Sequence, residues 1–174
     1  MVQTRIFHAV PALLLMLACS PSTPPATTNT TPAADKAAVE KAHDVLEGSY
    51  RNSDCEAMVS QAASDASMEP PNSPTAKGVD GIRAWCQPMF AQMKTKALTV
   101  ANKDIAISGD LAVDTGDYDW TLTPAAGGAD QRIQGRYVTI WHRQTDGSWK
   151  MNRLIWNSSQ PAPAMNQPAP AMKS

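Results

Sequence analysis

The chain has 174 residues, and its 15 Lys and Arg residues against 16 Asp and Glu residues give a net charge of −1. This length suits one domain of ordinary size. The near-neutral balance supplies no basic surface for a polyanion, which argues against nucleic acid as a partner.

Residues 1–18 are predicted to form a signal peptide. Arg5 precedes a mostly apolar run that is too short to cross a bilayer as a helix. The run ends in MLAC, which resembles a bacterial lipobox, and this resemblance implies that Cys19 becomes a lipidated first residue. The lipid would be the only membrane contact of a domain that faces the periplasm, and Ser20 favours the outer membrane. Secretion without a lipid is the alternative.

The two ends of the remaining chain have the composition of disordered segments. Residues 19–35, CSPSTPPATTNTTPAAD, are rich in Pro, Thr and Ala and lack an apolar period, so we expect a tether. Residues 160–174 repeat Gln-Pro-Ala-Pro-Ala-Met, which favours an extended, solvated tail. The folded domain is therefore expected at residues 36–159.

Three helices are predicted at the start of this domain. Asp35 is expected to N-cap the first, DKAAVEKAHDVLEGSYRN, and Asp54 the second, CEAMVSQAA. The third is GVDGIRAWCQPMFAQMK, which Pro88 should bend or break. Between the second and third helices, MEPPNSPTAKG reads as irregular because of its prolines.

Cys55 and Cys86 lie in these helical segments. Two cysteines in an exported chain suggest one disulfide, although two buried free thiols are the alternative. No His stands at ligand spacing from either Cys, so the sequence indicates no metal site, and no cofactor is expected.

After the helices the apolar period falls to two. Strands are predicted near residues 97–108, 111–123, 132–143 and 148–158, separated by the turn sequences SGD, PAAGGAD and TDGS. Helices followed by a meander predict an α+β fold, with three N-terminal helices packed on a four-stranded, mainly antiparallel sheet.

The last two strands are predicted to be apolar on both faces. Tyr137 and Trp141 alternate with Val138 and Ile140, and in the final strand Trp149, Met151 and Ile155 oppose Leu154 and Trp156. One face should pack under the helices. The other needs a cover, most simply a second subunit, so we expect a homodimer through the sheet.

Several stretches resemble the SnoaL-like, ketosteroid-isomerase-like superfamily. They are NSDCEAMVS, KGVDGIRAW, GDLAVDTGDYDWTL and GRYVTIWHRQTDGSWKMNRLIWNSS. The pattern is most similar to the bacterial branch related to the calcium/calmodulin-dependent kinase association domain. The resemblance covers residues 36–159 and implies the curved, cone-shaped, cystatin-like fold of nuclear transport factor two.

This resemblance implies a pocket between the helices and the concave sheet, with dimerisation through the sheet in many members. The catalytic residues of the isomerases are not found at the matching positions of this chain. The position of the isomerases' proton-moving Asp falls on Pro70, and an acid common in the final strand is replaced by Leu154. Fold alone does not settle function in this superfamily.

The candidate catalytic residues are Asp117, Asp119 and His142. The two carboxylates share a strand face and could serve acid–base chemistry if buried together, whereas a solvated stripe is the alternative. Asp114 faces the other way, with Tyr118 and Trp120. The aromatic candidates for a pocket, with an arginine for an anionic head group, are Trp85, Tyr118, Trp120, Tyr137, Trp141, Trp156 and Arg136.

Three functional hypotheses follow. The domain could bind a small apolar ligand or act as an interaction module of the cell envelope, without catalysis. It could be a lyase or isomerase whose acid–base site differs from that of the known isomerases. It could also be purely structural, with its cone filled by its own side chains.

Overall fold

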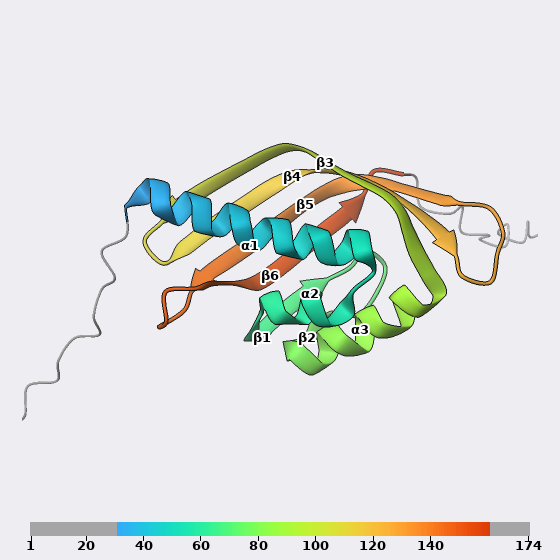
Figure 1. Cartoon of the computed structure of the whole chain (residues 1–174), viewed down its shortest axis with the longest axis horizontal. Coiled ribbons are helices and arrows are strands. Elements are labelled where there is room, and N and C mark those ends of the chain that lie inside the picture. Colours follow the sequence, from blue (N-terminus) through green and yellow to red (C-terminus); the bar gives the residue numbers. More distant parts are fainter. Residues whose placement is uncertain (1–30, 161–174) are drawn as a thin grey trace, which may run out of the picture.

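The computed structural model describes residues 31–160, which form three helices and one six-stranded sheet. The helices are α1 (Pro32–Asn52), α2 (Cys55–Gln61) and α3 (Gly78–Gln92). Figure 1 shows α1 lying along one face of the sheet, with α2 and α3 beside β1 and β2. Within residues 31–160, no helix is long and apolar enough to cross a membrane.

The sheet has the strand order β2-β1-β6-β5-β4-β3, and only the β1–β6 pair is parallel. The α+β class and the meander are confirmed, but the expected count of four strands is wrong. The bounds are β1 (Ala62–Glu69), β2 (Ala76–Lys77), β3 (Met93–Ser108), β4 (Leu111–Pro124), β5 (Gln131–Arg143) and β6 (Trp149–Ser158).

The two additional strands have weak local signals. The β1 sequence AASDASME contains no β-branched or aromatic residue, so its strand propensity is low. It is extended because it pairs with β6 on one side and with β2 on the other. Only contacts between distant parts of the chain could reveal it.

The start of α1 corrects the predicted cap. Thr31 is the N-cap, its side chain accepts a hydrogen bond from Ala34 N at 3.3 Å, and Pro32 occupies the first turn. The helix therefore begins inside the segment predicted to be a tether. Asp35 instead forms an ion pair with Arg143 of β5 at 2.6 Å, and this contact holds the first turn of α1 against the sheet.

A disulfide joins Cys55 of α2 to Cys86 of α3, with the two Cα atoms 5.5 Å apart. The predicted Asp54 cap of α2 is confirmed, because its side chain accepts from Ala57 N at 3.0 Å. Pro88 lies inside α3, which continues to Gln92, so of the predicted bend or break the break is wrong.

A register shift between β5 and β6 changes which side chains of the final strand face the core. Ile140 pairs with Arg153, but the next residue, Trp141, pairs with Met151. Met151 and Leu154 are consequently both buried, instead of lying on opposite faces as predicted. The outer face still carries exposed apolar side chains, namely Leu111, Val113, Val138 and Ile155.

Candidate ligand-binding pocket

A pocket lies between α1 and the inner face of the sheet. It holds about 550 Å³ of free space when its open mouth is included. Four of the predicted pocket aromatics line it, together with residues of α1 and β3. The lining residues are His43, Leu46, Glu47, Tyr50, Leu98, Val100, Tyr118, Trp120, Tyr137, Thr139, Leu154 and Trp156.

The α1 wall follows from helical spacing. His43, Glu47 and Tyr50 are four and then three residues apart, so they share one face of the helix. The sheet wall follows from alternation along β4, where Tyr118 and Trp120 point toward the helix.

Gly116 of β4 positions the ring of Tyr137 on the neighbouring strand. A Cβ atom at Gly116 would lie 2.7 Å from the Tyr137 hydroxyl oxygen, so a larger side chain would displace the phenol. The glycine thus lets the phenol reach across β4, where its hydroxyl donates to Asp114 Oδ1 at 3.1 Å.

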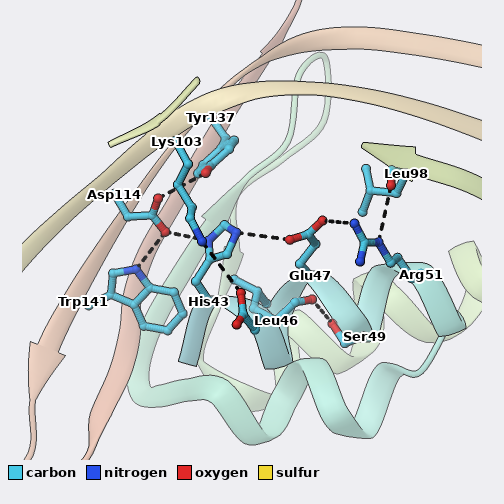
Figure 2. A network of polar contacts seen from close by, with 11 residues as sticks. His43, Leu46, Glu47, Ser49, Arg51, Leu98, Lys103, Asp114, Tyr137 and Trp141 are labelled. Carbon is cyan, nitrogen blue, oxygen red and sulfur yellow. Dashed lines mark hydrogen bonds and ion pairs between the residues drawn. The ribbon is translucent and has the colours of Figure 1, made fainter. Parts of the chain in front are cut away.

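Asp114 lies behind the pocket lining and holds His43 of the α1 wall in place (Figure 2). Asp114 is fully buried, and its Oδ2 lies 2.7 Å from His43 Nδ1. The same oxygen accepts from the Trp141 indole at 3.2 Å. Three donors from α1 and β5 therefore satisfy one buried carboxylate.

His43 is held as a cation between two carboxylates. Burial alone would lower its pKa, but the hydrogen bond with Asp114 and the contact with the Glu47 carboxylate outweigh burial and raise the pKa to about 9. Its Nε2 is 3.4 Å from Glu47 Oε2, an ion-pair contact that lacks hydrogen-bond geometry. This contact with His43 is the main cause that lowers the pKa of Glu47, so Glu47 is a carboxylate at neutral pH.

The same cluster contains a potential set of metal ligands that the sequence did not indicate. His43, Asp44 and Glu47 bring one ligand atom each within 4.8 Å of one another. Glu47 also pairs with Arg51 at 2.5 Å (Figure 2). Asp44 lies 3.7 Å from Lys103. Because both carboxylates already have cationic partners, the geometry is that of an ion-pair network.

The structure places the predicted catalytic residues outside the pocket. Asp117 pairs with Arg136 at 3.5 Å, and Asp119 pairs with Arg132, which lowers the pKa of Asp119. His142 lies on the same outer face of the sheet, since it alternates with the buried Trp141. Strand alternation brought Asp117 and Asp119 together on the solvent side.

The other predicted pocket residues are also displaced from the lining. Arg136 is on the outer face with 78% of its side chain exposed. Trp141 is completely buried beneath the pocket, and Trp85 packs edge-on against Trp156 with ring centroids 5.6 Å apart. Trp85 and Trp141 therefore support the pocket from outside.

His43, Glu47 and Tyr50 were missed as functional residues. The available signal was the position of His43 on the apolar face of a predicted helix, where a polar side chain needs a buried partner. Asp114 could have been that partner, because its strand face was assigned correctly. The two residues are 71 positions apart, and nothing local connects them.

Comparisons with known proteins agree with this architecture. The family model of the SnoaL-like domain matches residues 39–151. A nuclear transport factor 2-like superfamily protein from Salmonella enterica serovar Typhimurium LT2 is 15% identical, with 79% of this chain and 99% of that chain covered and a TM-score of 0.67. No curated protein matches the chain.

Two further solved structures share the fold. One, from Xanthomonas campestris, is described as a calcium/calmodulin-dependent protein kinase II association domain, with 19% identity, coverage of 79% and 94%, and a TM-score of 0.59. The other is a hexachlorocyclohexane dehydrochlorinase with 19% identity, coverage of 80% and 97%, and a TM-score of 0.66. At these identities the likeness shows the cone fold alone.

Proposed function

The chain belongs to the SnoaL-like domain family, and we propose that its domain binds one small, largely apolar molecule in the pocket under α1. The observation that carries this proposal is the lining. Aromatic and aliphatic side chains form the walls, while the two charged lining residues, His43 and Glu47, are paired with each other. A ligand that covers these walls gains hydrophobic free energy without breaking that pair.

We extend this proposal to the cell envelope. The lipobox-like MLAC supports lipidation at Cys19, and the lipid would anchor the domain on the periplasmic side of the outer membrane. Because α1 begins at Pro32, the segment between the lipid and the domain would be shorter than the predicted tether.

The exposed apolar side chains on the outer face of the sheet support the proposed homodimer. Leu111, Val113, Val138 and Ile155 lie on neighbouring strands, and the pairs Val113–Ile140 and Val138–Ile155 are in register. The same face of a second copy would remove this surface from water.

Native mass spectrometry of the full chain purified from the periplasm tests ligand binding and the homodimer together. We expect a dimer that retains a small molecule, and we expect Val138→Glu to shift the protein to monomers because it buries a charge in the interface. Thr121→Glu is the control, because Thr121 lies on the same face beyond the apolar patch and its cross-strand neighbour is Arg132. A wild-type monomer would contradict the dimer, and protein that neither retains nor takes up apolar probes would contradict ligand binding.

A second candidate is proton transfer on the bound molecule, as in a lyase or isomerase. It is favoured by the ion pair on the α1 wall of the pocket, where Glu47 is a carboxylate and His43 an imidazolium at neutral pH. Glu47 would accept a proton from the ligand, and His43 would donate one. One solved structure of the same fold is named a hexachlorocyclohexane dehydrochlorinase, and removal of hydrogen chloride belongs to this class of reaction.

Nitrobenzisoxazole, which opens when a base removes its ring proton, tests this second function. We expect turnover in the wild type and a loss of at least tenfold in Glu47→Gln, because the amide cannot accept the proton. Glu56→Gln is the control, since Glu56 is an exposed carboxylate paired with Arg83. Equal rates in Glu47→Gln and the wild type would remove Glu47 as the base, and a rate that rises near pH 9 would assign the step to His43.

A further inference from the structure

Two aromatic side chains of the pocket lining are backed by α3, although no described residue of α3 is itself in the lining. Trp85 of α3 packs edge-on against Trp156, with ring centroids 5.6 Å apart, and Phe90 of α3 packs edge-on against Tyr50 at 6.1 Å. Trp156 lies on β6 and Tyr50 on α1, so they belong to different walls of the pocket. The position of α3 therefore fixes a side chain in each of these two walls.

The local sequence of α3 stabilises a helix poorly. Its N-cap residue, Lys77, makes no side-chain capping hydrogen bond, and Gly81 and Pro88 lie inside the helix. Gly has a low helix propensity, and Pro removes one backbone hydrogen bond from the helix. The helix therefore depends on its contacts with the rest of the domain.

The disulfide between Cys55 and Cys86 is a covalent contact of this kind. Cys86 lies on the buried face of α3, directly after Trp85 in the sequence, and the bond joins it to α2. An ion pair at 2.9 Å also links these two helices, between Glu56 of α2 and Arg83 of α3, but it is partly exposed, and such pairs add little stability. The disulfide is thus the contact with α2 that restrains α3 most firmly.

We propose that this disulfide is a redox switch of the pocket: the oxidised domain binds the apolar ligand, and reduction weakens binding because α3 no longer holds Trp156 and Tyr50 in place. The inference rests on the proposed binding function and adds its regulation. In the oxidising periplasm, where we place the domain, the bond would persist and the pocket would be competent to bind.

A dithiol supplies the two electrons of the reduction. Its thiolate attacks Sγ of Cys55, which is half-buried, and the bond to the fully buried Cys86 breaks, so that Cys86 leaves as a thiolate and takes up a proton. The second thiol of the reductant then displaces Cys55, which is also released as a thiol. The reductant leaves as a cyclic disulfide, and the domain retains two free cysteines.

Dithiothreitol and N-phenyl-1-naphthylamine, a neutral apolar dye that fluoresces when it is bound, test the proposal. The dissociation constant of the dye is measured by fluorescence titration of the full chain with and without dithiothreitol. We expect it to rise about three- to tenfold on reduction, the effect of a binding-competent conformation that is populated only about 10–30% of the time. Circular dichroism should show that the helices and strands persist.

Cys55→Ser is the matched variant, because it removes the bond at the half-buried sulfur and keeps the buried Cys86. It should bind the dye as weakly as the reduced wild type and should not respond to dithiothreitol. Equal dissociation constants for the oxidised and reduced wild type would overturn the redox switch and leave the binding function standing. A response of Cys55→Ser to the reductant, or a reduced wild type without its helices and strands, would also overturn it. If the oxidised wild type did not bind the dye, both proposals would fail.

Discussion

Asp114→Ala is expected to lower the free energy of unfolding by about 3–5 kcal/mol, the cost of removing one partner from a buried ion pair. Asp114 is fully buried and accepts from His43, Tyr137 and Trp141. Its loss leaves an imidazolium without its principal counter-charge and two further donors without an acceptor. Equilibrium urea denaturation of the two proteins measures the difference.

Asp117→Ala is the control for this prediction. Asp117 lies on the same strand, but it faces outward, and both side chains of its ion pair with Arg136 are exposed. Exposed pairs contribute only about 0–1 kcal/mol, so this variant should stay close to the wild type. Similar losses of unfolding free energy in the two variants would show that the buried contacts of Asp114 contribute no more to stability than an exposed ion pair.

The stability of the domain should fall as the pH rises through the titration of His43. The pKa of His43 is raised from 6.5 in the unfolded chain to about 9 in the folded domain. The folded state therefore holds a proton that the unfolded state releases. The resulting stability is fully present below pH 6.5, declines between pH 6.5 and 9, and is lost above it, a change of about 3 kcal/mol.

Denaturation at a series of pH values measures this decline, and His43→Gln should abolish it. His142→Gln is the matched control, because His142 lies on the outer face of the sheet and the decline should persist without it. Titration of the His43 ring by NMR gives an independent reading. A ring that titrates near pH 6.5 in the folded protein would contradict the ion-pair network.

Most helices and strands of the fold follow from local sequence patterns. Alternation in residues 111–123 and 132–143, with Gly-containing turns between them, is enough to predict β4 and β5 within a residue or two. Helical spacing is likewise enough for α1 and α3. Both signals are local, because a period of two or of 3.6 residues is set by backbone geometry.

The family resemblance and the aromatic content also indicated a pocket before its walls were known. Tyr118, Trp120, Tyr137 and Trp156 line it in the structure, because the alternation that defines each strand also selects the face of its aromatic residues.

Only the tertiary structure decided which polar residues matter. The sequence shows Asp117, Asp119 and His142 as clearly as it shows Asp114 and His43, since residue type carries no information about burial. Packing of α1 on the sheet buried Asp114 of β4 against His43. The register shift beside Trp141 turned Leu154 inward, where it lines the pocket. These contacts join residues far apart in the chain, so the free energy that selects them comes from burial and partner satisfaction, which no local pattern records.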